Sequence, residues 1–144
     1  MGCVCGVGYE GRSVEDLVHL VSEAGVTALV DVRLNAISRK PGLSKGRLAE
    51  RLGAAGIRYE HMPALGNPKD NREGFRRGEA AARGRYRHIL SNGSSPAVDR
   101  LIEMTADETV ALLCYERNAA ECHRSAVVEE MRRREPSITV CGLD

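Results

Sequence analysis

The stretch TVALLCYERNAAECHRS, residues 109–125, decides how this chain folds. Its first part is an apolar run that ends at the thiol of Cys114, as expected of a buried β-strand. A short polar loop follows, and a helix is then predicted from Cys122 onward. A buried strand that leads through a loop into a helix is the repeating unit of parallel α/β sheets, so the rest of the chain is expected to repeat it.

The same alternation of apolar runs and amphipathic segments extends over the whole chain. Ser13 and Asp16 form a capping box before the first predicted helix. Strands are predicted at residues 3–8, 27–32, 57–62, 109–114 and 138–141, and helices at residues 14–24, 44–55, 71–90, 95–105 and 122–134. Glycines at positions 74, 78 and 84 interrupt the third helix. This order predicts a single α/β domain over residues 1–144 with three layers, in which helices cover both faces of five mostly parallel strands.

The composition is that of an ordinary soluble domain. Hydrophobic residues make up 42% of the chain, charged residues make up 28%, and the net charge is +1. This balance gives no overall attraction to nucleic acid or to a membrane, so any attraction must come from a local patch. No apolar run reaches the roughly 18 residues of a membrane span, and no signal peptide precedes the first strand. We therefore expect a cytoplasmic protein with no membrane partner.

The five cysteines suit a reducing compartment. Cys3, Cys5 and Cys141 lie in predicted strands, where buried thiols are expected to be inert. Cys122 lies at the start of a helix beside Arg124, so we expect it to be the most reactive of the five thiols.

A metal site is not expected. Zinc sites use paired spacings such as C-x-x-C, which this chain lacks. The set Cys114, Glu116, Cys122 and His123 contains suitable ligand types, but its spacing matches no known signature. We predict neither a metal nor another cofactor.

Ionisable residues follow four of the predicted strands, at the edge where open parallel sheets bind ligands. Asp31 lies inside an apolar run and needs a partner, so a structural pair with an arginine and a catalytic role both remain open. His61 is either a general base or a structural histidine. The catalytic candidates are Asp31, His61, Cys114, Glu116, Cys122 and His123.

Arg124 lies in the first turn of the last predicted helix, where the helix dipole disfavours a cation. A cation beside free backbone N–H groups is explained if an anion binds there. We therefore predict an anion site made of Arg33, Arg124 and the N–H groups of residues 120–122. In the alternative interpretation, Arg124 pairs with a carboxylate of the loop or with Asp31 and only holds the loop.

The loop Gly8-Tyr9-Glu10-Gly11 lies at the same edge. Its two glycines would let the backbone approach a ligand, although a tight turn explains them equally well. Tyr9 and Tyr115 both follow strands and either flank a flat ring or pack on the loops. The ligand-binding candidates are Gly8, Tyr9, Glu10, Gly11, Arg33, Arg39, Tyr115, Arg124 and Ser125.

One segment has a local excess of positive charge. It contains Arg72, Arg76, Arg77, Arg83, Arg85 and Arg87, with only Glu73 and Glu79 opposing them. Such a segment either contacts a phosphate backbone or forms a solvated helix face. Aromatic residues make up 3% of the chain, which argues against an extended stacking platform for single strands.

Several motifs resemble a known family. They are Gly8-Tyr9-Glu10-Gly11-Arg12-Ser13, Val30-Asp31-Val32-Arg33 with Ser38-Arg39, Gly56-Ile57 with Tyr59 and His61, Leu65-Gly66, and Leu113-Cys114-x-Glu116 with Cys122-His123-Arg124. Together they resemble the domain-of-unknown-function 488 family over almost the whole chain. The resemblance implies a small cytosolic α/β domain and no established activity.

A fainter likeness is to rhodanese-type sulfurtransferases. The counterparts are Asp31-Val32-Arg33, Cys114 and Arg124-Ser125. Nine residues separate Cys114 from Arg124 here, whereas that family places only a few between its cysteine and its helix arginine.

Three functions follow as hypotheses. The favoured one is an anion-binding pocket at the carboxyl ends of the strands, for a nucleotide, another phosphate-bearing ligand or a nucleic-acid fragment. The first alternative is a rhodanese-like sulfurtransferase that uses Cys114 or Cys122. The second is a non-catalytic nucleic-acid-binding module that uses the segment from Arg72 to Arg87. Whether the protein is an enzyme stays open at this point.

Overall fold

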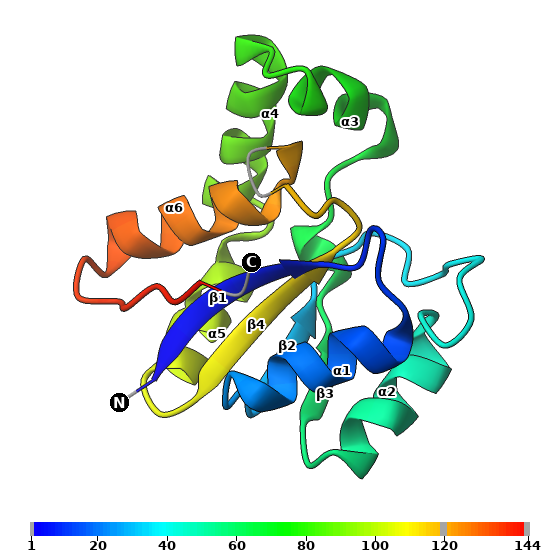
Figure 1. Ribbon diagram of the computed structural model, residues 1–144. Coiled ribbons are helices and arrows are strands. Elements are labelled where there is room, and N and C mark those ends of the chain that lie inside the picture. The colour runs from blue at the N-terminus through cyan, green and yellow to red at the C-terminus, as the bar shows by residue number, and fades with distance from the viewer. Residues whose placement is uncertain (1, 119–120, 143–144) are drawn as a thin grey trace.

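The structure is a computed structural model that describes residues 2–118 and 121–142. At its centre is a sheet of four parallel strands, β1 (Cys3–Gly8), β2 (Ala28–Asp31), β3 (Arg58–His61) and β4 (Thr109–Cys114). They lie side by side in the order β1-β4-β2-β3, so the last of these strands is inserted between the first two (Figure 1). The predicted parallel sheet is confirmed, but with four strands instead of five.

Helices cover both faces of this sheet, as predicted. They are α1 (Val14–Glu23), α2 (Lys45–Ala54), α3 (Lys69–Arg76), α4 (Ala80–Ser91), α5 (Ser95–Thr105) and α6 (Arg124–Arg134), with a short 3-10 helix η1 (Pro63–Leu65) after β3. α1 and α2 pack on one face, and α4, α5 and α6 pack on the other. No helix within the described residues is long and apolar enough to cross a membrane.

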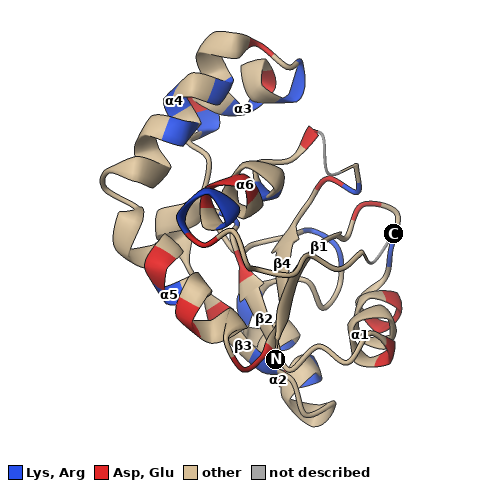
Figure 2. Cartoon of the chain, turned by 90° about the vertical axis from the view of Figure 1, so that its left-hand side faces the viewer, with Lys and Arg blue, Asp and Glu red and all other residues tan. Residues whose placement is uncertain are grey.

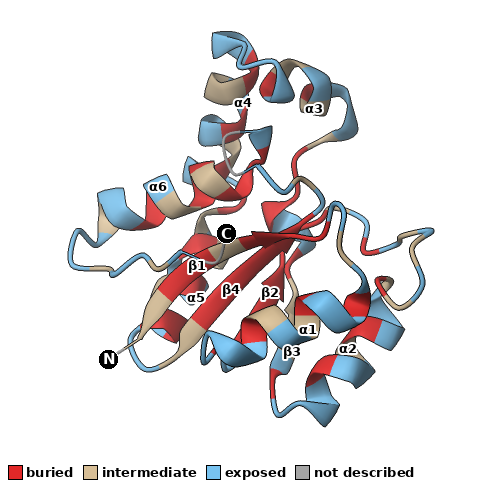
Figure 3. Ribbon diagram, viewed as in Figure 1, coloured by how far each residue is buried: buried red, intermediate tan, exposed pale blue. Residues whose placement is uncertain are grey.

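The core consists of two apolar clusters, one on each face of the sheet. Alternate strand residues point to opposite faces. Cys5 and Val7 of β1 pack under α1 and α2, whereas Val4 lies in the cluster under α5 and α6. Because helices cover both faces, β1, β2 and β4 are buried along most of their length (Figure 3), which explains why their sequences are mostly apolar. The edge strand β3 has no fully buried residue, and its sequence is polar.

Residues 138–141, predicted as a fifth strand, form only an isolated bridge between Val140 and Val4. The segment runs along the outer edge of β1, where Val4 N–H donates to Thr139 O at 3.0 Å and Cys141 N–H donates to Val4 O at 2.9 Å. Val140 is 44% exposed, so further pairing would bury little apolar surface. The prediction was wrong because a short apolar segment does not reveal whether a core lies beneath it.

Two helices also differ from the prediction. Residues 71–90 are divided between α3 and α4 at Gly78, whose φ of +78° is a left-handed conformation that glycine adopts readily. The last helix begins at Arg124 instead of Cys122, so Cys122 and His123 lie in the turn that precedes it.

The strand order creates a crevice at the carboxyl edge of the sheet. The chain leaves β1 and β2 toward α1 and α2 on one face, and it leaves β4 toward α6 on the other. Because β4 lies between β1 and β2, neighbouring strands send their connections to opposite faces. Ligands in open parallel sheets bind at such points. α3 and α4 rise beyond the sheet, at the top of Figure 1.

Gly8 is expected to be a packing residue, and its replacement by Ala should lower the free energy of unfolding. The added methyl group would lie 1.9 Å from the carbonyl oxygen of Glu116, and we expect a cost of about 1–3 kcal/mol for displacing that backbone. Gly53→Ala in α2 is the matched control, because nothing lies within 4 Å of its added methyl group. Urea unfolding measures both variants, and equal stability of the two would contradict this role of Gly8.

Candidate functional site

A cavity of about 230 Å³ lies beyond the carboxyl ends of β1, β2 and β4. The loops after these strands, α3 and the turn before α6 form its walls. The lining residues are Tyr9, Arg33, Leu34, Asn35, Ile37, Asn67, Arg72, Arg76, Cys114, Tyr115, Glu116, Glu121 and His123. A larger depression of about 930 Å³ lies between the start of α1 and α2, but no cysteine borders it. The cavity therefore brings together six of the predicted site residues: Tyr9, Arg33, Cys114, Tyr115, Glu116 and His123.

Asp31 is fully buried and paired with Arg33, as the sequence predicts. Arg33 Nε donates to Oδ1 at 2.8 Å and Nη2 donates to Oδ2 at 2.6 Å, which is a bidentate arrangement. The hydroxyl of Tyr59 donates to Oδ2 at 2.6 Å. Although burial alone lowers the pKa of Arg33, these bonds to Asp31 raise it, and the guanidinium stays charged. The oxygens of Asp31 are thus occupied by protein donors, and Asp31 does not line the cavity.

Both candidate histidines bind backbone carbonyls. His61 Nε2 lies 2.8 Å from the Arg33 carbonyl oxygen, and His123 Nε2 lies 2.8 Å from that of Val32. Burial lowers the pKa of His123 to about 4, and the positive charges of Arg72 and Arg124 act in the same direction. The ring is therefore neutral at neutral pH. Its Nε2–H donates to Val32, which leaves Nδ1 as an acceptor.

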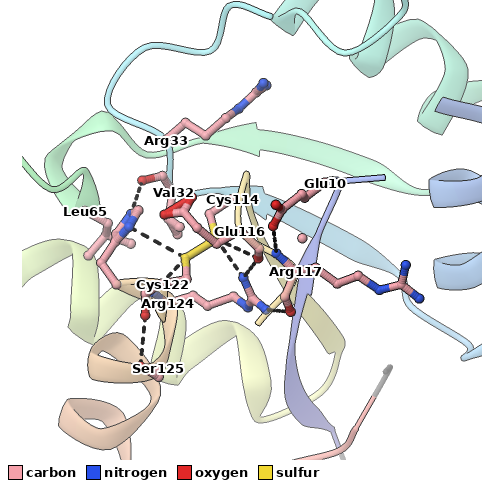
Figure 4. Close-up of a disulfide and its surroundings, with 12 residues drawn as sticks. Glu10, Val32, Arg33, Leu65, Cys114, Glu116, Arg117, Cys122, Arg124 and Ser125 are labelled. Atoms are coloured by element: carbon pink, nitrogen blue, oxygen red, sulfur yellow. Dashed lines mark hydrogen bonds between the residues drawn. A yellow bond between two sulfur atoms is a disulfide. The ribbon is translucent and has the colours of Figure 1, made fainter. Parts of the chain in front are cut away.

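Cys114 and Cys122 are joined by a disulfide that links the end of β4 to the turn before α6 (Figure 4). Cys114 borders the cavity, whereas Cys122 is fully buried and does not. The predicted free thiol of Cys122 is therefore absent in this state. The sequence does not reveal the bond, because the two cysteines are eight residues apart and only the fold shows that their sulfurs meet. Cys3, Cys5 and Cys141 are thiols.

Arg124 lies beneath the disulfide, is only 1% exposed and does not line the cavity. Its Nη1 donates to Cys114 Sγ at 2.8 Å and to the carbonyl of Glu116, and Nη2 donates to the carbonyl of Arg117 at 2.8 Å (Figure 4). A Cβ at Gly6 would lie 2.7 Å from Nε, so the glycine leaves room for this side chain. The guanidinium of Arg124 points into the protein, so the predicted anion site at this residue stays a prediction. Arg124 holds the loop after β4 through the carbonyl groups of Glu116 and Arg117.

A comparison with known protein families matches most of the sequence. A family model described as a domain of unknown function, DUF488, matches residues 13–131, which is most of the chain. The chain belongs to the DUF488 family. The comparisons find no match among curated proteins or solved structures. No relation to rhodanese-type sulfurtransferases is found either, and the family description names no activity. The function of this DUF488 protein must therefore be argued from its site.

Six predicted ligand-binding residues do not line the cavity of this DUF488 protein: Gly8, Glu10, Gly11, Arg39, Arg124 and Ser125. Glu10 accepts a hydrogen bond of 3.1 Å from the backbone of the loop after β4, and Ser125 donates one of 2.9 Å to the turn before α6. Gly11 has a φ of +74° in the turn before α1, and Arg39 is exposed. Ala120, part of the predicted anion site, lies outside the described residues.

The basic segment is partly neutralised by its own surroundings. Arg77 pairs with two glutamates and Arg85 with an aspartate, while the guanidinium of Arg83 lies 4.3 Å from the centre of a phenylalanine ring. Arg72 and Arg76 differ, because they line the cavity. Sequence analysis placed them in the basic segment but not in the site. Their spacing of four residues on a helix indicates a shared face, but not which part of the fold that face meets.

A metal centre has little support in this oxidation state. Cys114, Glu116 and Cys122 each place one ligand atom within 4.8 Å of the others. The disulfide, however, leaves neither sulfur as a thiolate. The guanidinium of Arg124, 2.8 Å from Cys114 Sγ, also opposes a cation at this point.

The Asp31–Arg33 pair is expected to be among the most stabilising polar contacts. Asp31→Ala should lower the free energy of unfolding by about 3–5 kcal/mol, because it leaves a buried guanidinium without its partner. Glu60→Ala removes an ion pair with Arg100 that is partly exposed, so this control should cost less than about 1 kcal/mol. Both values come from urea unfolding. Similar decreases in the free energy of unfolding for the two variants would show that the buried pair stabilises the fold no more than the exposed one.

The stability of the protein should fall as His123 titrates. The pKa of its ring is about 4 in the folded protein against 6.5 ordinarily. Between these two pKa values the unfolded chain binds a proton that the folded protein does not. The contribution of His123 to the free energy of unfolding is therefore complete above the upper value and is lost as the pH falls through the lower one. The loss approaches about 3 kcal/mol. His123→Gln should flatten this dependence in urea unfolding across pH, whereas His88→Gln, at an exposed position, should not. An unchanged slope in His123→Gln would contradict the assignment.

Proposed function

We propose that the cavity binds a small anionic molecule, such as a phosphate-bearing compound, through Arg72 and Arg76. One observation carries the proposal: two arginines, four residues apart on α3, line one wall of a cavity at the carboxyl edge of the sheet. Side chains at this spacing lie on the same side of a helix. Guanidinium groups donate paired hydrogen bonds to phosphate and carboxylate oxygens, which makes such a wall suitable for an anion.

These two arginines have donors to offer a ligand. Arg72 uses Nε to bind the carbonyl of Asn67 at 3.1 Å, and no described residue occupies its terminal nitrogens. Within residues 2–118 and 121–142, the side chain of Arg76 makes no hydrogen bond or ion pair with the protein. In contrast, the guanidinium of Arg33 already donates hydrogen bonds to Asp31 and to the backbone carbonyl of Leu43. Lys and Arg positions gather on α3 and α4 at the top of Figure 2.

The other groups around the cavity add to its selectivity. Glu116 and Glu121 also line it, so a ligand that places donors opposite its anionic group fits better than a plain anion. The rings of Tyr9 and Tyr115 meet edge to face with centroids 5.4 Å apart, so they leave no slot for a ring between them. Tyr115 is 46% exposed, and a flat ring is expected to stack on its free face.

The size of the cavity favours a small molecule over a nucleic-acid strand. Its volume of about 230 Å³ lies below the roughly 300 Å³ at which pockets for drug-sized ligands begin. The basic segment also offers less free charge than its six arginines imply, because Arg77 and Arg85 are already paired. Nucleic-acid binding through this segment therefore has less support than a small ligand.

Inorganic phosphate should stabilise the folded protein if the proposal holds. Saturation at a hundred times the dissociation constant corresponds to about 2.7 kcal/mol, which appears as a rise in melting temperature. Arg76→Ala should remove most of this rise, because the side chain is exposed and can be lost without disturbing the core. Thermal unfolding across a phosphate series, with chloride at equal ionic strength as reference, measures the effect.

Arg132→Ala is the matched control. It removes an exposed arginine of the same charge from the far end of α6, where it does not line the cavity. It should keep the full phosphate-dependent shift. A shift that is equal in both variants would place the phosphate elsewhere, and the absence of any shift in the unchanged protein would reject phosphate as a ligand.

A further inference from the structure

The disulfide at the floor of the cavity lies in an environment that favours thiol chemistry. The buried guanidinium of Arg124 donates to Cys114 Sγ at 2.8 Å and is held there by the carbonyls of Glu116 and Arg117 (Figure 4). After reduction, this fixed positive charge would stabilise a thiolate on Cys114. A cation of this kind makes a cysteine both a readier nucleophile and a better leaving group.

The two sulfurs differ in access. Both residues are buried, with exposed fractions of 1% for Cys114 and 0% for Cys122, but Cys114 lines the cavity and Cys122 does not. Cys122 also has an acceptor at hand, because His123 Nδ1 lies 3.8 Å from its Sγ and is not protonated at neutral pH. A molecule in the cavity therefore meets Cys114 first, and Cys122 is positioned to react only with Cys114.

We infer that Cys114 and Cys122 form a redox-active dithiol–disulfide pair that exchanges with small disulfides entering the cavity. The inference uses the cavity of the proposed function but does not require that the ligand be anionic. Cys114 is the attacking thiol and Cys122 is the resolving thiol.

The exchange balances without a further reagent. The Cys114 thiolate attacks one sulfur of a small disulfide, RSSR, so that a mixed disulfide forms on Cys114 and one RS⁻ leaves and takes a proton from water. Cys122 then attacks Cys114 Sγ, which forms the protein disulfide and expels the second RS⁻, with the proton of Cys122 passing to it. The dithiol is oxidised by two electrons and RSSR is reduced to two thiols.

The same placement opposes stable sulfur transfer. If Cys114 carried a persulfide, Cys122 would attack Cys114 Sγ, form the protein disulfide and expel hydrosulfide. A second thiol within bonding distance of Cys114 would therefore remove the sulfur from the persulfide, which is the intermediate that a sulfurtransferase must keep.

The test uses the full chain and a neutral probe, hydroxyethyl disulfide. The protein is reduced with dithiothreitol under native conditions, freed of reductant and exposed to the probe. It is then quenched with acid, alkylated and mapped by mass spectrometry. In the unchanged protein we expect the Cys114–Cys122 disulfide to be lost and regained. Cys122→Ser should accumulate a mixed disulfide on Cys114, and Cys114→Ser should form none on Cys122.

Cys5→Ser is the matched control. Cys5 is a buried thiol of β1 that does not border the cavity, and burial raises its pKa well above the usual range. This variant should behave as the unchanged protein does. Cys3 and Cys141, whose sulfurs lie 2.9 Å apart, are followed as separate peptides so that oxidation between them is not counted.

Three results would overturn the inference: a disulfide that dithiothreitol opens only after the protein unfolds, a mixed disulfide on Cys122 in Cys114→Ser, or none on Cys114 in Cys122→Ser. The phosphate experiment uses no thiol reagents, so phosphate can prove not to bind even if thiol–disulfide exchange is observed. The exchange experiment uses a neutral probe, so exchange can be absent even if phosphate binds. The two proposals are therefore tested separately.

Discussion

The buried guanidinium of Arg124 is the contact on which the site depends. It joins the first turn of α6 to the end of β4 and to the loop between them, through Cys114 Sγ and the carbonyls of Glu116 and Arg117. A buried charge is costly unless its donors find partners, and here backbone carbonyls supply them. The side chain fits only because residue 6, which lies in β1, is a glycine. This arrangement fixes where α6 begins, and with it the positions of Cys122 and His123.

The arginines near the carboxyl edge of the sheet differ in burial and in what their side chains contact. Arg33 and Arg124 are buried, and each donates hydrogen bonds to protein acceptors. Arg72 and Arg76 are less buried and keep donors toward the cavity. A buried cation that already donates to protein acceptors has less to gain from a ligand than a partly exposed one, which exchanges water for an anion. We therefore propose the arginines of α3, ahead of Arg33 and Arg124, as the residues that bind a ligand.

The sequence predicts the features that arise from local patterns. The apolar runs of β1, β2 and β4, the helices on both faces and the polar carboxyl edge are all readable from periodicity and chain order. The buried pairing of Asp31 is readable too, because a carboxylate within an apolar strand needs a partner. The features it could not predict depend on long-range geometry: how α3 is placed over the edge, which way Arg124 points, and whether residues 138–141 rest on a core.

We propose that a ligand binds in the cavity at the carboxyl edge of the sheet rather than in the larger depression between α1 and α2. An NMR titration of the labelled protein with inorganic phosphate, followed at backbone amides and arginine side chains, distinguishes the two places. We expect saturable shifts at the cavity, in Asn67, Arg72 and Tyr115. Shifts confined to the depression, at Gly11 and Arg47, would contradict it.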